Sequence, residues 1–72
     1  MITKPQNFEE LLNLWESPKA LSDDIAIPYV SAQMMKFRSS VAVRHWPAII
    51  EAARRRGVPL TMDDLVRMKV AA

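Results

Sequence analysis

The segment from Leu21 to Met35 reads LSDDIAIPYVSAQMM, and it decides the fold that the rest of the chain must complete. Leu21 and Ile25 lie four residues apart, which places both side chains on one face of a short helix. Ser22 and Ala26 have the same spacing and are small enough to let a second helix approach closely. The segment therefore begins with a helix that is suited to packing against a neighbour.

A turn and a second helix follow within the same segment. Pro28 interrupts the first helix and can itself begin the next one, in which Ala32 and Met35 lie on a common face. Two short helices that cross at a steep angle around a tight turn form a helix-turn-helix, whose second helix can enter the major groove of DNA. The segment predicts this motif.

Helix signals continue on both sides of the segment. Asn7 and Glu10 have the spacing of a capping box, and Ser17 precedes Pro18 as a residue that caps a helix start. Gly57 ends a later helix, because glycine accepts the left-handed conformation that follows a last turn. The pattern predicts an all-α, compact bundle of about five short helices in one domain over residues 1–72, with helices near 8–15, 18–26, 28–38, 44–56 and from 61 onward.

The composition narrows the class of protein. A 72-residue chain without cysteine has neither a disulfide nor a thiolate metal site, and its single histidine rules out an ordinary zinc finger. Half of the residues are hydrophobic and a quarter are charged, which is typical of a folded globule. The apolar runs are short, so we expect no membrane span, no signal peptide and a cytoplasmic location.

The charge is unevenly distributed along the chain. Residues 1–35 contain two basic and five acidic residues, whereas residues 36–72 contain eight basic and three acidic ones. A basic second half permits a surface that faces a polyanion. The run Arg54, Arg55 and Arg56 lies near a helix C-terminus, where cations favour the helix dipole, and its members point in different directions. We expect a structural role for this run.

The residues beyond the segment carry a family resemblance. They are the basic end Lys36-Phe37-Arg38, the step Arg44-His45-Trp46, the helix Ile49-Ile50-Glu51-Ala52-Ala53, and then Gly57 and Leu60-Thr61. With the helix-turn-helix, they resemble the small phage and prophage helix-turn-helix proteins of the Cro-type repressor superfamily. The resemblance implies a lambda-repressor-like fold and a transcriptional regulator.

Three positions depart from that family's pattern. Met35 stands where an aromatic residue is usual, Phe37 interrupts the basic run, and Val41-Ala42 replaces an Ile-Pro step. The first two departures make the second helix of the motif more apolar than is usual in the family.

The residues that would meet base edges lie near the start of the second helix of the motif. They are Tyr29, Val30, Ser31 and Gln33. Gln33 could bridge adenine N6 and N7, and Val30 could pack on a thymine methyl group. Tyr29 and Ser31 are equally able to hold a phosphate.

Contacts to the DNA backbone are expected on both sides of that helix. Lys36, Arg38 and Arg44 lie at or just beyond its end, where phosphates would pass. Ser17 and Lys19 lie at the start of the preceding helix, whose unpaired amides favour a phosphate. Double-stranded DNA is the partner that this arrangement predicts.

Two apolar pairs suggest a second kind of contact. Met34 and Phe37 lie three residues apart and form one ridge, and at least one of them should face outward. Val66 and Val70 offer a second possible dimer surface near the C-terminus. A homodimer that reads an inverted repeat is the favoured state, because small helix-turn-helix modules gain affinity by pairing half-sites.

Other functions are weighed against DNA binding. The sequence contains no phosphate loop, nucleophile–base set or cofactor motif. Asp23 and Asp24 are adjacent, so they do not share a helix face as a catalytic pair of carboxylates would. We therefore expect neither catalysis nor a cofactor, metal or small-molecule substrate. Two alternatives remain: a protein-interaction module that keeps this fold without DNA binding, and the DNA-recognition part of a phage packaging or recombination complex.

The large apolar side chains are expected in the core, among them Phe8, Leu12, Trp15, Trp46 and Ile49.

Overall fold

Every regular element in the computed structural model, which describes residues 4–71, is a helix. The elements are α1 (Phe8–Leu12), α2 (Pro18–Ile25), α3 (Tyr29–Arg38), the 3-10 helix η1 (Val43–His45), α4 (Trp46–Arg55) and α5 (Met62–Ala71). The prediction of an all-α bundle with about five short helices is confirmed for this part of the chain.

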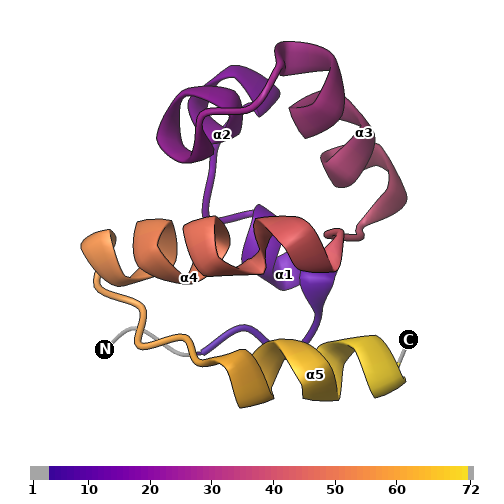
Figure 1. Ribbon diagram of the computed structural model, residues 1–72, viewed down its shortest axis with the longest axis vertical. Coiled ribbons are helices and arrows are strands. Elements are labelled where there is room, and N and C mark those ends of the chain that lie inside the picture. The colour runs from indigo at the N-terminus through magenta and orange to yellow at the C-terminus, as the bar shows by residue number, and fades with distance from the viewer. Residues whose placement is uncertain (1–3, 72) are drawn as a thin grey trace.

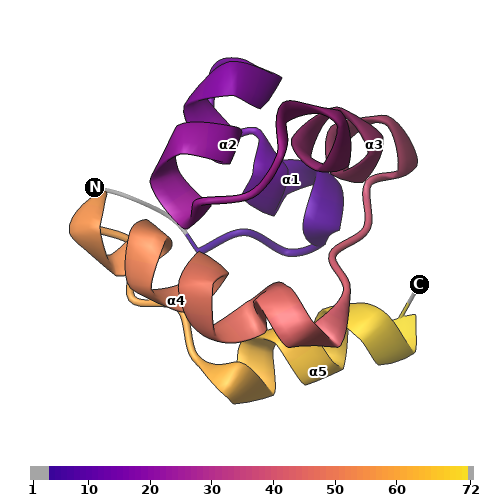
Figure 2. The same cartoon turned by 45° about the horizontal axis from the view of Figure 1, so that its top comes forward.

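The helices are arranged around α4. In both views α2 and α3 lie on one side of α4, and α5 lies on the other (Figures 1 and 2). The short α1 contacts both α3 and α5, and so it connects the two sides. The described residues form a compact body with dimensions of 26 × 25 × 18 Å.

The core draws large apolar side chains from every α-helix. Trp15 and Ile49 are fully buried, and the indole of Trp46 is buried with its Nε1 donating to the carbonyl oxygen of Val41 at 3.1 Å. This bond satisfies the one polar atom of that side chain. The five core residues expected from the sequence are all buried, together with Leu11, Leu21, Ile25, Ala32, Met35, Val41, Ala52, Ala53, Val58, Leu60, Leu65 and Met68.

Three of the predicted helix starts are confirmed by their capping bonds, whereas α4 begins at Trp46 rather than near residue 44, because η1 occupies residues 43–45. The Asn7 side chain accepts from the amide of Glu10 at 2.8 Å, and the Ser17 hydroxyl accepts from the amide of Ala20 at 3.2 Å. At α5, the Thr61 hydroxyl accepts from the amide of Asp64 at 3.3 Å. Each bond satisfies a backbone donor that has no partner inside its helix.

The first helix is shorter than predicted. It ends at Leu12 rather than extending through Trp15. The ammonium group of Lys36, on α3, donates to the carbonyl oxygens of Leu12 and Trp15, at 2.9 Å each. A cation that binds the last carbonyls of a helix satisfies them where the chain turns away. The indole of Trp15 still reaches the core from outside the helix.

The turn between α2 and α3 differs from the expected arrangement at Ala26. This residue, expected at the contact between the two helices, is exposed and ends α2 in the left-handed conformation with φ of 55°. The amide of Ile27 then bonds to the carbonyl oxygen of Ser22 at 3.2 Å, and the Ser22 hydroxyl donates to the carbonyl oxygen of Ile27 at 2.5 Å. These two bonds hold the turn closed.

Asp24 joins three parts of the fold. One carboxylate oxygen accepts from Trp15 Nε1 at 2.6 Å and from Arg56 Nε at 3.0 Å, and the backbone oxygen of Asp24 accepts from Arg55 at 3.1 Å. The bond from Trp15, together with the arginines, lowers the pKa of Asp24 despite its partial burial. The guanidinium of Arg56 also lies 5.4 Å from the centre of the Trp15 ring. Asp24 is therefore a structural residue.

Candidate nucleic-acid interface

α3 presents one long exposed face. It follows α2 after the three residues 26–28, and it turns Ala32 and Met35 into the core. Because side chains on one face of a helix recur every three to four residues, the opposite face is formed by Val30, Gln33, Met34 and Phe37, all of which are exposed. We call these four residues the outer face of α3.

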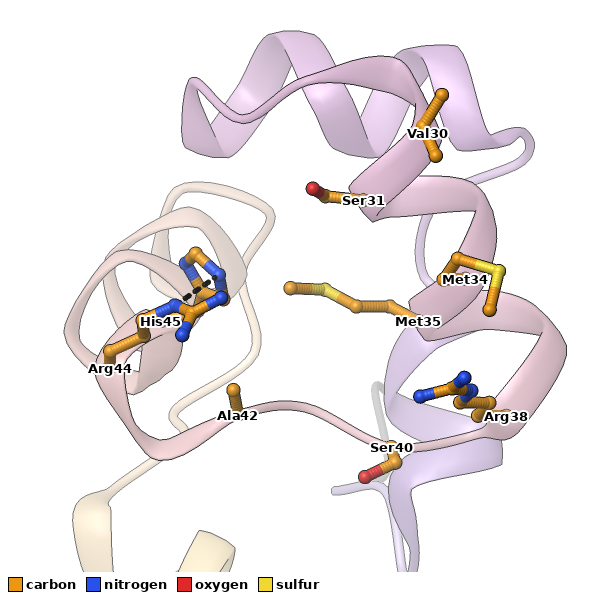
Figure 3. Close-up of a pocket in the computed structure, with 9 residues that line it drawn as sticks. All are labelled: Val30, Ser31, Met34, Met35, Arg38, Ser40, Ala42, Arg44 and His45. Carbon is orange, nitrogen blue, oxygen red and sulfur yellow. Dashed lines mark hydrogen bonds between the residues drawn. The ribbon is translucent and has the colours of Figure 1, made fainter.

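A groove of about 320 Å³ lies beside this face, between α3 and η1. Figure 3 shows Ser31 and Met35 extending from α3 toward His45, with Ala42 on the segment that connects the two sides. The lining is completed by Val30, Met34, Arg38, Ser40 and Arg44. The groove thus continues the exposed surface of α3 onto η1.

The charged groups at this groove are all basic. Arg38 and Arg44 are exposed, His45 is half-buried, and no described lining residue is acidic. Arg44 Nε donates to His45 Nε2 at 3.4 Å, whereas the side chain of Arg38 makes no hydrogen bond or ion pair with another residue between 4 and 71. α3 itself contains no Asp or Glu. This side of the molecule therefore suits an anionic partner.

Most of the other cations are bound within the fold. Five ion pairs link Lys4 and Arg67 to Asp64, Lys19 to Asp23, Arg55 to Glu51, and Arg56 to Asp24, at distances of 2.6 to 3.5 Å. Arg54 donates to the carbonyl oxygen of Leu60 at 3.3 Å. The structural role expected for the arginine run is thereby confirmed, and three of the eight basic residues of the second half, Arg55, Arg56 and Arg67, are paired with carboxylates.

The residues proposed for base contacts lie together on α3. Tyr29 and Val30 are 47% and 65% exposed, Gln33 is exposed, and Ser31 is half-buried. Val30 and Ser31 border the groove, while Gln33 lies on the outer face. All four are accessible from the side of the molecule that α3 covers.

The residues proposed for backbone contacts divide into three groups. Arg38 and Arg44 both line the groove, as a surface for phosphates requires. Ser17 caps α2 and Lys19 pairs with Asp23 at 3.5 Å, and neither lines the groove. Lys36 requires a correction, because its ammonium group is held by two carbonyl oxygens at the end of α1. We assign Lys36 a structural role and exclude it from the interface.

The residues proposed for protein contacts are all exposed. Met34 and Phe37 are 40% and 86% exposed on α3, and Val66 and Val70 are 46% and 80% exposed on α5. The expectation that the ridge of Met34 and Phe37 turns at least one side chain outward is confirmed. Self-association remains a prediction.

The sequence predicted His45 to be a surface or phosphate-contacting residue, and it did not place Ser40 and Ala42 in the site. They enter it because the chain after α3 returns along that helix and forms η1 beside it (Figure 3). The one usable signal was Pro47, which can occupy only the first turn of α4 and so fixes the residues before it at the helix entrance. The path of residues 39–42 had no such signal.

Between residues 4 and 71, no helix is long and apolar enough to cross a bilayer, and no three His, Cys, Asp or Glu residues gather as metal ligands would. Comparison of the chain with protein-family models, curated proteins and solved structures finds no match.

Proposed function

We propose that this protein binds double-stranded DNA sequence-specifically, with α2 and α3 acting as a helix-turn-helix, and that it serves as a transcriptional regulator. The observation that carries the proposal is the exposed outer face of α3 beside a groove whose charged residues are two arginines. A helix of this kind fits the major groove, which is about 12 Å wide. The absence of acidic residues from α3 removes the repulsion that phosphates would otherwise meet.

In this proposal the residues in the first half of α3 recognise the bases. The Gln33 amide can donate and accept at the same time, which matches the N6 and N7 atoms of adenine. Val30 offers a methyl surface to thymine, and Tyr29 and Ser31 supply hydroxyl groups to bases or phosphates. Such contacts give preference for a short sequence.

In this proposal the arginines at the groove provide most of the affinity for DNA. Arg38 and Arg44 would contact phosphates that pass along the groove, because they line it from α3 and from η1. Neither has a carboxylate partner among residues 4–71, so binding DNA breaks no internal ion pair. Two such copies on an inverted repeat would double these contacts.

The proposal is tested by selecting bound duplexes from a random pool at two salt concentrations. We expect an enriched short sequence, and Gln33→Ala should weaken binding to it about tenfold while leaving random DNA unaffected. Arg44→Ala should weaken both alike and reduce the salt slope by about one per copy. The control is Arg54→Ala, which removes the same charge in the last turn of α4, away from the residues that line the groove. Binding that selects no sequence, or that ignores salt, would contradict the proposal.

A second candidate function is a protein-interaction module, and the exposure of Phe37 favours it. A phenyl ring that is 86% exposed, next to Met34 and Val30, is typical of a surface that another protein covers. Under this candidate, Met34→Lys abolishes association with a protein partner and leaves retention on heparin or DNA unchanged. Under DNA binding, the added cation strengthens retention on DNA instead.

A further inference from the structure

α5 exposes an apolar ridge that nothing else in the described fold covers. Met62, Val66 and Val70 recur every four residues along the helix and are 46%, 46% and 80% exposed. Leu65 and Met68 face the core from the opposite side. Because residues four apart lie one above the other, the three exposed side chains form one continuous row, which we call the α5 ridge.

Two opposite charges flank the α5 ridge, one on each side, and the exposed Arg67 on the Asp63 side is already paired with Asp64 at 2.6 Å. Asp63 lies three residues before Val66 and Lys69 lies three residues after it. At about 100° per residue, these two side chains project on opposite sides of the row, each about 60° from Val66. Both residues are exposed, and neither forms an ion pair with another residue between 4 and 71.

We propose that a second copy of this chain docks on the α5 ridge, around a two-fold axis that runs along the row. Such an axis brings Met62, Val66 and Val70 against their own counterparts. The two-fold rotation also brings the Asp63 side of one helix opposite the Lys69 side of the other helix. Asp63 of each copy therefore faces Lys69 of the other copy, and the dimer contains two such pairs. Packing of four-residue ridges is the commonest way in which two helices cross.

The outer face of α3 lacks this self-complementarity. Its apolar residues are flanked by Arg38 and, across the groove, by Arg44, and α3 carries no acidic residue. Two copies joined there would place like charges together, which is unfavourable. Charge therefore distinguishes the two apolar surfaces: α3 suits an anionic partner, and α5 suits a second copy of the chain.

The two surfaces can be used at the same time. α5 lies on the other side of α4 from α2 and α3 (Figures 1 and 2). The α5 ridge thus supplies the pairing that the proposed reading of an inverted repeat requires. This link rests on the proposed function, but the docking itself does not, and its test uses no DNA.

The first test measures the mass of the protein by sedimentation over a concentration series. We expect a reversible dimer for the unchanged protein. Val66→Asp places a carboxylate on the two-fold axis and should abolish dimer formation. Phe37→Asp is the matched control, because it makes the same kind of change at an exposed position on α3 and should leave the dimer intact. A chain that stays monomeric at millimolar concentration overturns the proposal, as does a dimer that persists with V66D and is lost with F37D.

The second test reverses the flanking charges. Asp63→Lys and Lys69→Asp should each weaken the homodimer, by about tenfold at low salt, because two attractive pairs become repulsive. When the two variants are mixed, attraction is restored at both pairs, and a heterodimer should form with at least the affinity of the unchanged protein. Circular dichroism of each variant confirms that α5 remains folded. A mixture that forms no heterodimer overturns the proposed geometry.

The outcomes also separate this inference from DNA binding. A V66D protein that is monomeric should still bind a single half-site, with lower affinity for the full inverted repeat. Loss of DNA binding in variants of Gln33 or Arg44 leaves the dimer unaffected. The experiments can therefore contradict DNA binding without contradicting docking on the α5 ridge, and the reverse.

Discussion

Asp64 is the most heavily bonded side chain of the fold, and replacing it with asparagine gives the clearest stability prediction. Its carboxylate is 6% exposed. One oxygen accepts from the Lys4 ammonium at 3.1 Å and from the amide and hydroxyl of Thr61 at 3.0 Å each, and the other accepts from Arg67 at 2.6 Å. Asp64→Asn keeps the shape of the side chain and removes its charge.

The size of the effect follows from the pKa of Asp64. Burial by itself raises this pKa, but the hydrogen bonds from Lys4 and Thr61 outweigh burial and lower it from 3.8 to about 2. A change of that size corresponds to about 2 kcal/mol in favour of the folded state when the carboxylate is ionised. For a chain of this length, the melting temperature of D64N should fall by about 10 °C at neutral pH.

The pH dependence has a definite sign. Because the pKa of Asp64 is lower in the folded state, folding favours the ionised carboxylate. Its contribution is complete above the unfolded value of 3.8 and is lost as the pH falls toward 2. The stability difference between the unchanged protein and D64N should therefore be constant near neutral pH and disappear across that acidic range.

Urea denaturation at several pH values, at low protein concentration, measures this difference. Asp63→Asn is the control, because it removes a neighbouring but exposed carboxylate and should change stability by no more than about 0.5 kcal/mol at pH 7. The reasoning is refuted if D64N is as stable as the unchanged protein at pH 7. It is also refuted if the difference persists undiminished at pH 2.

Three further predictions concern the interior contacts. Lys36→Met should lower the free energy of unfolding by about 1.5 kcal/mol, because it leaves two carbonyl oxygens without their cation, and the salt slope of any DNA binding should not change. Asp24→Asn should destabilise the fold and alter the fluorescence of Trp15, whose indole bonds to that carboxylate. Ala26→Gly should raise the free energy of unfolding by about 0.5 kcal/mol, since glycine adopts a positive φ without strain, and a destabilised A26G protein would contradict the left-handed turn.

The parts of the fold that depend on neighbouring residues were predictable. Asn7, Ser17 and Thr61 cap helices through bonds that reach only three residues, so the sequence contains both partners. The end of α4 is equally local: Gly57, two residues after its last residue, has a φ of 85°, and the amides of residues 57 and 58 bond to the carbonyl oxygens of Arg54 and Ala53. The helix order followed from these signals together with apolar spacing.

The parts that depend on distant residues were not predictable. Lys36 reaches carbonyl oxygens 21 and 24 residues earlier, and no local pattern reveals such a partner. α2 and α3 both end in a left-handed residue, Ala26 and Ser39, where glycine would have been the usual signal. The candidate site follows the same division: its α3 residues and Arg44 were identified from the sequence, whereas the positions of Ser40 and Ala42 depend on the path of the loop between α3 and η1.

The placement of charge connects the two proposals. The second half of the chain has eight basic residues, yet within the described fold only Arg38 and Arg44 lie at the groove without a carboxylate partner. Two phosphate contacts release few counterions, so one copy should show a salt slope of only about 2 and bind weakly. Pairing through the α5 ridge raises the contacts to four and the slope to about 4. A surface with so few free cations thus needs a second copy of the chain to select its DNA site at physiological salt. Within the described fold, the self-complementary charges on α5 are the feature that would bind this second copy.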